Sequence, residues 1–377
     1  MIDKILLAPY YLTLKARHAM FDCGMRKVHT SEVPTICLGN VTVGGTGKTP
    51  HTEMILRTLM EDENWGSKNL AVLSRGYKRK TKRFQQVTQG GSAKLFGDEP
   101  QQVKNKFPSV TVAVDKNRIR GCNYLCHPDQ LIGNKKERKC LDPNFPAADL
   151  IVLDDAFQYR NLRANVNIML VDYSRPIFND YLLPLGSLRD LPERIKDSEI
   201  IIVSKCPSYL DEWERTKWAN SLGLKNFNPA TGRGKRKDGK EQLLLFTTIS
   251  YCAPEAIFPE GDMRYTYSKR LVLFTGIAND KPLQMYLSDS YKIMKHLDFP
   301  DHHNFTNRDI KAIAAAAAEV PTSVIATTEK DSQRIVECKK IPLELRQRLF
   351  HVPIRVSFLT DSEKEAFKTE LFRLLAL

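Results

Sequence analysis

The sequence lacks a hydrophobic run long enough to cross a bilayer, a closely spaced cysteine framework and any long low-complexity tract. Its N-terminal apolar stretch is interrupted by Pro9, whereas a membrane-spanning helix needs roughly 20 apolar residues. The eight cysteines are spread from Cys23 to Cys338, and no apolar core with a cleavage site stands at the N-terminus. We therefore expect a globular protein with free thiols in a reducing, cytoplasmic setting.

Acidic residues are outnumbered, because 44 Asp and Glu stand against 57 Lys and Arg, a formal charge of +13. This excess favours an anionic partner, which can be a phosphorylated substrate, an anionic membrane surface or nucleic acid. The basic run 75–83 lacks interleaved aromatic residues beyond Tyr77 and the adjacent Phe84. Nucleic-acid binding therefore has little support, and a substrate phosphate or a membrane is favoured.

The stretch 36–50 joins an apolar strand-like run, a glycine-rich turn and a helix start. The turn and helix start consist of Thr42, Val43, Gly44, Gly45, Thr46, Gly47, Lys48 and Thr49. Such a turn binds phosphate oxygens through its N–H groups, the lysine reaches the β and γ phosphates, and the threonine hydroxyl binds Mg²⁺. The usual pattern has glycine in place of Thr42, so the first turn must be formed differently. The alternative, a tight turn with an incidental lysine, is less favoured.

Two pairs of adjacent acidic residues are candidates for metal binding or proton transfer. Asp154 and Asp155 end an apolar strand, where a carboxylate of a nucleotide enzyme meets Mg²⁺, although helix N-caps also use Asp. Asp98 and Glu99 stand in a loop with Gly97 and Pro100. A kinase needs a carboxylate to deprotonate its acceptor hydroxyl, so either is a candidate, while local sequence rules alone favour a β-turn.

Two clusters that contain histidine or cysteine are candidate metal sites. Asp301, His302 and His303 favour a proton-handling histidine beside a carboxylate, because the i, i+4 spacing of a zinc helix is missing. A surface loop is the alternative. A second cluster comprises Cys122, Cys126, His127 and Cys140. It lacks paired C-x-x-C spacing, which favours ordinary thiols over zinc.

The predicted fold is α/β, with short apolar strands alternating with helices in a doubly wound parallel sheet and a second, smaller α/β domain. Residues 1–28 form an amphipathic basic helix that lies either on a membrane surface or on the protein's own core. Residues 29–228 form the first domain, 229–242 a basic linker or hairpin, and 243–377 the second domain. Thr306 with Asp309, and Thr360 with Glu363, predict two helix starts.

Taken together, these motifs resemble the tetraacyldisaccharide 4′-kinase family of the lipid A pathway. The resemblance rests on segments in family order over nearly the whole chain: 39–50, 73–77, 97–100, 154–158, 183–189, 276–278, 301–302 and 328–331. In this family the phosphate loop itself carries Thr at the position of Thr42. The resemblance implies a P-loop NTPase-like kinase domain that binds ATP.

The resemblance also implies the reaction, which is transfer of the γ-phosphate of ATP to the 4′-hydroxyl of a tetraacyldisaccharide 1-phosphate lipid. It implies that Asp98 and His302 act together as the base. Mg²⁺ is expected near Thr49, Glu99, Asp154 and Asp155, and phosphate groups of the substrate near Arg75, Arg118 and Arg189. It further implies a location at the cytoplasmic face of the bacterial inner membrane, with the first helix on the membrane. We also expect a monomer without a nucleic-acid partner.

Two departures from the family pattern stand out. Tyr159 occupies a position that is usually His, and Ser187 to Asp190 replace the usual Pro-Leu-Arg-Glu. Two other functions compete. A regulatory GTPase would read guanine with Asn/Thr-Lys-x-Asp, but the lysine of 328–331 stands one place late and 204–207 lacks the Asp. A nucleic-acid-stimulated ATPase is motivated only by the positive charge.

Overall fold

A computed structural model describes residues 2–132, 134, 140 and 142–376, and shows an α/β protein with mixed sheets. The larger sheet has eleven strands in the order β10-β11-β12-β9-β8-β2-β6-β3-β5-β4, with β18 paired to β12. The strands are β2 (Thr35–Gly39), β3 (Leu70–Ser74), β4 (Gln85–Gln86), β5 (Thr111–Val114), β6 (Leu150–Asp154), β8 (Val166–Asp172), β9 (Ile200–Ser204), β10 (Lys225–Asn228), β11 (Arg233–Lys235), β12 (Glu241–Tyr251) and β18 (Ile354–Phe358). Strands β12 to β5 run parallel, and the outer pairings are antiparallel.

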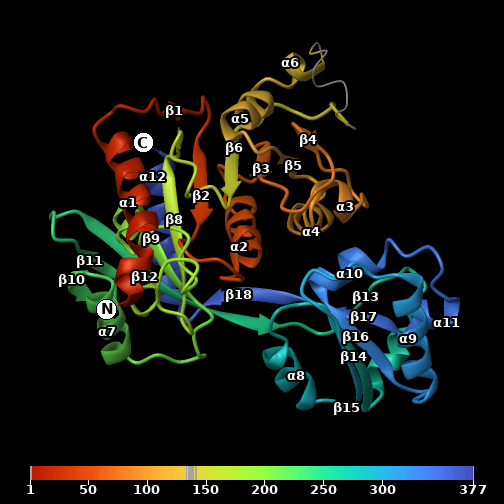
Figure 1. Cartoon of the computed structure of the whole chain (residues 1–377). Coiled ribbons are helices and arrows are strands. Elements are labelled where there is room, and N and C mark those ends of the chain that lie inside the picture. The colour runs from red at the N-terminus through yellow and green to blue at the C-terminus, as the bar shows by residue number, and fades with distance from the viewer. Residues whose placement is uncertain (1, 133, 135–139, 141, 377) are drawn as a thin grey trace.

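Helices cover both faces of this sheet, as the sequence predicts (Figure 1). They are α1 (Ile2–Asp22), α2 (Lys48–Met60), α3 (Ala93–Phe96), α4 (Asp98–Lys106), α5 (Arg118–Cys126), α6 (Pro128–Ile132), α7 (Glu212–Ser221) and α12 (Asp361–Leu375). Side chains alternate between two cores along each strand, so Ile151 of β6 packs with Leu14 of α1, whereas Val152 packs with Ile55 of α2 and Phe367 of α12. Burial on both faces explains why these strands are continuous apolar runs.

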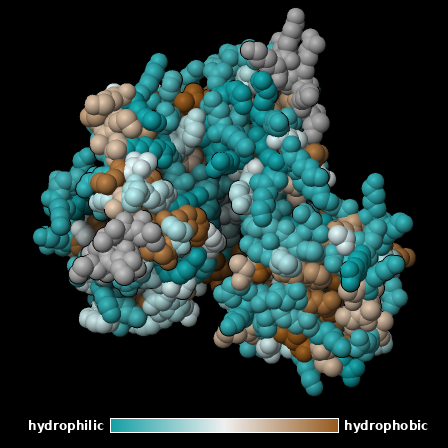
Figure 2. Space-filling view, viewed as in Figure 1, coloured by the Kyte–Doolittle hydropathy of each residue, from teal (hydrophilic) through white to brown (hydrophobic). Residues whose placement is uncertain are grey.

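The smaller sheet has five strands in the order β13-β17-β16-β14-β15. The elements are β13 (Glu255–Ala256), β14 (Arg270–Thr275), β15 (Lys292–Asp298), β16 (Val324–Thr328), β17 (Leu349–Val352), α8 (Lys281–Ser288), α9 (Asn307–Ala318), α10 (Glu329–Ile335) and α11 (Leu343–Arg348). The short strands β1 (His29–Thr30) and β7 (Leu162–Arg163) form a separate pair. The larger sheet with its helices is called the larger part of the molecule below, and the smaller sheet with its helices the smaller part. Figure 2 shows a mostly hydrophilic surface that is hollowed between these two parts.

The chain does not pass between the two parts at the domain boundaries predicted from the sequence. Segment 229–242 contains β11 and the start of β12, which pair as an antiparallel hairpin of the larger sheet, so the structure shows the hairpin alternative and not the linker. Strand β18 pairs with β12, and Leu371 of α12 lies in the core of the larger part. The chain therefore crosses to the smaller part along β12 and returns along β18 (Figure 1). Pairing between segments about 110 residues apart leaves no local signal in the sequence.

Helix α1 packs one stripe of side chains on the body of the protein. Leu7, Leu14 and Phe21 are buried, whereas Leu12 is 61% exposed. The hydroxyl of Tyr10 donates to the carbonyl of Arg189 at 3.0 Å. Among the helices of the described part of the chain, none is long and apolar enough to span a bilayer.

Glu363 fixes the returning helix α12. Its backbone N–H bonds to Thr360 Oγ1 in the predicted capping box, and its Oε1 accepts hydrogen bonds from Arg215 of α7 at 2.7 Å and from the N–H of Phe246 in β12 at 3.0 Å. Both Arg215 and Glu363 are buried. Thr306 and Asp309 form the other predicted capping box, at the start of α9.

We expect Glu363→Gln to lower the free energy of unfolding by about 3 kcal/mol, because the guanidinium of Arg215 would stay buried without its counter-charge. Urea unfolding measures this change. Glu365→Gln, at an exposed position of the same helix, serves as the control and should change stability by less than about 0.5 kcal/mol. Equal effects of the two substitutions would contradict this account of α12.

Candidate active site

The turn after β2 is organised by the buried side chain of Asn40. Its amide donates to the hydroxyls of Thr42 at 3.1 Å and Thr46 at 2.9 Å. Thr42 pairs with Leu188 in an isolated β-bridge, and the N–H of Val43 donates to the carbonyl of Ser187 at 2.7 Å. These contacts form the first part of the turn without the glycine that the usual phosphate-loop pattern has at this position.

The second part of the turn does require glycine. Gly44 and Gly47 have φ angles of +95° and +84°, in the region that side chains disfavour. A Cβ added to Gly45 would meet nothing within 4 Å, so the turn faces open space there. Lys48 begins α2 directly after Gly47. The turn therefore directs backbone groups and a helix N-terminus into a space that is open to a ligand.

His51 anchors this turn to the sheet, a role that the sequence analysis missed. Its Nδ1 donates to the carbonyl of Gly47 at 2.7 Å, and its Nε2 lies 2.9 Å from the hydroxyl of Thr247 in β12. Burial lowers the pKa of His51 to about 4, so the ring is neutral at physiological pH. The i, i+4 spacing from Gly47 is the signal that would have indicated this bond.

Asp154 and Asp155 lie beside the turn because β6 neighbours β2 in the parallel sheet. Asp155 has a positive φ of 49° and forms ion pairs with Arg189 and, at 3.8 Å, with Lys48. Burial and the adjacent charge of Asp155 raise the pKa of Asp154 to about 6. Ser74 donates to one oxygen of Asp154 at 3.0 Å, while the other, Oδ1, is buried without a hydrogen-bond partner.

The three arginines expected near substrate phosphates have different environments. Arg189 is held by Asp155 and donates to the side-chain oxygen of Asn40 at 2.6 Å. Arg118 is buried and donates to the carbonyls of Asp115 and Asp154. Arg75 is exposed at the end of β3. Of the three, Arg75 leaves its guanidinium most accessible from solvent.

Asp98 and Glu99 form the first turn of α4, not a β-turn, and Gly97 is the N-cap with a φ of 100°. The side chains of both residues contact the smaller part of the molecule. Glu99 pairs with Lys330 at 2.7 Å, and Asp98 Oδ2 lies 3.1 Å from His302 Nδ1. Burial by itself raises the pKa of Asp98, but hydrogen bonds from His302 and Arg334 outweigh it and lower the pKa to about 2.

The charged residues beside the glycine-rich turn interact electrostatically with Glu99 at the start of α4. Burial lowers the pKa of Lys48, and the charges of Asp155, Asp154 and Glu99 oppose that shift. Glu99 also contributes to the raised pKa of Asp154. The glycine-rich turn, the acidic pair of β6 and the start of α4 are therefore parts of one site.

Several other candidates lie outside this site. His303 stacks on Phe299 and bonds to Asp309 at 3.0 Å, which is a structural role. His127 bonds to Glu32. Cys122 and Cys126 form no disulfide, and burial raises the pKa of Cys122 to about 12. Within residues 2–132, 134, 140 and 142–376, the grouping of side chains with metal-binding spacing is Asp280, His296 and Asp298, which includes none of the cysteines.

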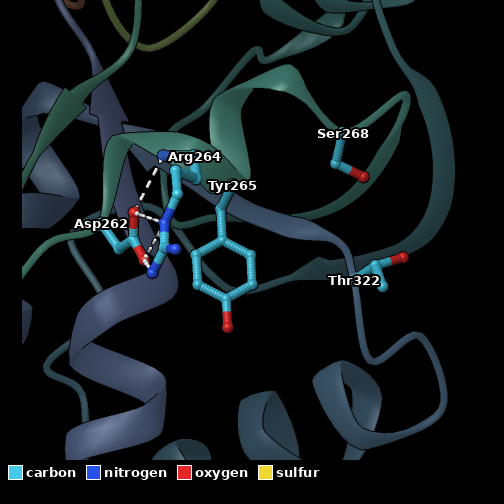
Figure 3. A pocket seen from close by; sticks show the side chains of 5 residues that line it. All are labelled: Asp262, Arg264, Tyr265, Ser268 and Thr322. Atoms are coloured by element: carbon cyan, nitrogen blue, oxygen red, sulfur yellow. Dashed lines mark hydrogen bonds and ion pairs between the residues drawn. The ribbon is translucent and has the colours of Figure 1, made fainter.

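A surface hollow of about 500 Å³ lies elsewhere, lined by Asp262, Arg264, Tyr265, Ser268 and Thr322 (Figure 3). Ser268 and Thr322 precede β14 and β16, so the hollow lies at the amino ends of these strands. Ligands of parallel α/β sheets bind at the carboxyl ends. The Asp262 carboxylate is already bonded to Arg264 (Figure 3). This hollow is therefore separate from the candidate active site.

Comparison with known proteins assigns the chain to a family. The sequence model described as Tetraacyldisaccharide-1-P 4′-kinase matches residues 4–375. The chain belongs to this family. A tetraacyldisaccharide 4′-kinase of Phocaeicola vulgatus is 36% identical over 362 residues, which cover 94% of this chain and 89% of the relative. A relative of the same name from Porphyromonas gingivalis is 32% identical, covering 96% and 93% of the two chains.

A solved structure shares the fold. It is that of the "apo" form of LpxK from Aquifex aeolicus in complex with ATP, which matches over the full length of both chains with a TM-score of 0.68 and 22% sequence identity. In the family member described here, Asp98 and His302, both selected from the sequence, contact each other, and a residue that was not selected joins them. Arg334 of α10 contacts both Asp98 and His302, and only its i, i+3 spacing from Asp331 hinted at a role.

We expect Asn40→Ala to weaken ATP binding at least tenfold, which corresponds to about 1.4 kcal/mol. The substitution removes the acceptor shared by Lys48 and Arg189 and the donor that holds Thr42 and Thr46. Calorimetric titration with a non-hydrolysable ATP analogue measures the affinity. Asn220→Ala, at an exposed position of α7, should bind like wild type. Wild-type affinity in Asn40→Ala would show that Asn40 does not organise the loop.

Proposed function

We propose that the protein transfers the γ-phosphate of ATP to the 4′-hydroxyl of a tetraacyldisaccharide 1-phosphate, a lipid A precursor. The observation that carries the proposal is the contact between Asp98 and His302, which come from different parts of the molecule. Family membership over residues 4–375 supports the same reaction. The protein is thus an ATP-dependent lipid kinase.

ATP binds over residues 42–49 in this proposal, as in a P-loop NTPase. The amides of the turn and the N-terminus of α2 bind the phosphate oxygens, and Lys48 reaches the β and γ phosphates. The positive φ of Gly44 and Gly47 and the open space at Gly45 support this placement. Gly44 also lies beside the guanidinium of Arg175, since a Cβ there would be 3.3 Å from its NH1.

The residues of the site fit Mg²⁺, which prefers oxygen ligands. Asp154 presents a buried carboxylate oxygen without a hydrogen-bond partner, and Thr49, Glu99 and Asp155 offer further oxygens. When bound, the ion supplies positive charge that neutralises the phosphates and orients the transferred group. The ion pair between Glu99 and Lys330 keeps that carboxylate ionised, because the nearby ammonium lowers the pKa of Glu99 against the opposing effect of burial.

Asp98 and His302 together accept the proton of the 4′-hydroxyl. As the hydroxyl oxygen attacks the γ-phosphorus, its O–H bond breaks, the new O–P bond forms and ADP leaves with the electrons of the broken P–O bond. The exposed guanidinium of Arg75 binds a phosphate group of the substrate. Arg118 and Arg189 hold other residues of the site in place, since both donate hydrogen bonds to protein groups.

The lipid substrate lies in a membrane, and we propose that α1 holds the protein at the membrane surface. Leu12 and Lys15 of α1 are exposed, as are Met25, Arg26 and Lys27 just after it, a combination suited to an anionic membrane surface. The protein then acts as a peripheral monomer at the cytoplasmic face of the inner membrane. The inner stripe of α1 stays on the protein, where His18 bonds to Asp190 at 2.6 Å.

The environment of segment 328–331 argues against the GTPase alternative. Lys330 is paired with Glu99, and Asp331 accepts hydrogen bonds from the N–H of Gly276 at 2.9 Å and the hydroxyl of Thr328 at 2.7 Å. Both side chains are thereby engaged at the junction of the two parts and not presented to a nucleotide base. No feature of the described residues favours the nucleic-acid alternative over the lipid kinase.

We expect purified protein with Mg-ATP to phosphorylate the disaccharide lipid but not the same lipid lacking its 4′-hydroxyl. Asp98→Asn should lower kcat by about 10²–10⁴-fold, the usual contribution of a general base, with little change in the KM for ATP. Transfer of labelled γ-phosphate measures both. Asp262→Asn, in the distant hollow, is the control and should retain full activity. An active Asp98→Asn enzyme, or transfer to the lipid without the hydroxyl, would refute the assignment.

A further inference from the structure

Arg334 joins four chain segments through one buried guanidinium. Its side chain is 4% exposed. Its Nε donates to Asp98 Oδ2 at 3.0 Å, and its NH2 contacts the same carboxylate and lies 3.0 Å from His302 Nδ1. Its NH1 donates to Asp331 Oδ1 at 3.1 Å and to the carbonyl of Gly276 at 3.4 Å. Each nitrogen of the guanidinium is thus engaged with protein groups.

The residues that contact Arg334 from the smaller part are themselves joined by hydrogen bonds. Asp331 lies one turn earlier on α10 and accepts hydrogen bonds from the N–H of Gly276 and from Thr328. His302 has a φ of 62°, and its own N–H bonds to the carbonyl of Gly276 at 3.1 Å. The loops after β14 and β15 and the start of α10 are therefore tied together around Gly276. Arg334 extends this unit across the junction to Asp98.

These contacts argue against a direct role of Arg334 on the transferred phosphate. A guanidinium that stabilises a phosphoryl group needs donors directed at that group. Here the guanidinium donates to Asp98, Asp331 and Gly276, lies beside His302 Nδ1, and is almost completely buried. The geometry instead suits the planar, multi-donor character of arginine, which a lysine ammonium does not reproduce.

We propose that Arg334 is the positioning residue of the Asp98–His302 pair, holding the carboxylate from one part of the molecule against the imidazole from the other. The proposal rests on the function proposed above, in which this pair accepts the proton of the acceptor hydroxyl. Arg334 acts through the two side chains and does not touch the substrate. It fixes the distance between them and the orientation of the ring.

The first test compares Arg334→Gln and Arg334→Lys with wild type in the lipid kinase assay. We expect kcat to fall roughly 30-fold or more in Arg334→Gln, because a misplacement near 1 Å at a reacting group costs about 100-fold. The KM values for ATP and lipid should change less than about threefold. Arg334→Lys should recover less than a tenth of the wild-type kcat, because one ammonium does not span the same partners.

Arg264→Gln is the matched control, since this arginine of the smaller part is 89% exposed and paired only with Asp262 among the contacts described. It should keep the wild-type kcat and urea midpoint. Any of three results would overturn the proposal: full activity of Arg334→Gln, full activity of Arg334→Lys, or a loss of kcat that is accompanied by an equal loss of ATP binding. The urea midpoint of Arg334→Gln, if close to that of the control, excludes unfolding as the cause.

The second test reads the ring of His302 directly and does not depend on turnover. Nitrogen-15 spectra of histidine-labelled protein, assigned with His302→Gln, should show one fixed tautomer of His302 in wild type and averaged ring signals in Arg334→Gln. Identical ring signals in both proteins would overturn the positioning role. If wild type itself failed to phosphorylate the lipid while the ring signals responded as expected, the proposed function would fail and the structural role of Arg334 would stand.

Discussion

Charge pairing across the junction of the two parts is the interaction on which the site depends. Asp98 and Glu99 begin α4 in the larger part and are mostly withdrawn from solvent. A buried carboxylate without a counter-charge costs several kcal/mol, so their pairing constrains how the two parts meet. Lys330 and Arg334 supply the counter-charges from a single helix, at the i, i+4 spacing that places both on one face.

Both sheets present their carboxyl ends to this junction. Asn40, Arg75 and Asp154 stand at or after the ends of β2, β3 and β6, the strand edge that also carries the glycine-rich turn. On the other side, Gly276 follows β14, and Arg334 lies on the helix that follows β16. Parallel strands gather their loops at one edge. Two such edges facing each other bring the glycine-rich turn and the Asp98–His302 pair to one junction.

Local signals in the sequence predicted much of this structure. The predicted pattern of short apolar strands is seen in β3, where Leu70 to Ser74 are all buried, and both capping boxes were predicted because their bonds span only three residues. Strand β15 lacks this apolar pattern because its side chains are mostly exposed or half-buried at a sheet edge. The start of α4 was misread because Gly97 caps it without a side-chain hydrogen bond.

Long-range contacts were beyond the reach of such signals. Arg334 and Asp98 are separated by 236 residues, and no spacing rule links them. The return of β18 and α12 to the larger sheet likewise depends on tertiary pairing. The pairing of Asp98 with His302 was expected from the family resemblance and from no local spacing, and the structure adds the contact itself. Asp98 and His302 meet, and His303 does not join them.

The most direct measurement of the central claim is a double-mutant cycle between Asp98→Asn and His302→Gln, with kcat for lipid phosphorylation as the readout. Residues that act as one unit give strongly non-additive effects. The account predicts that the double variant is no slower than the slower single variant. Losses that multiply would show that Asp98 and His302 work independently, and would contradict a proton-accepting pair assembled from the two parts of the molecule.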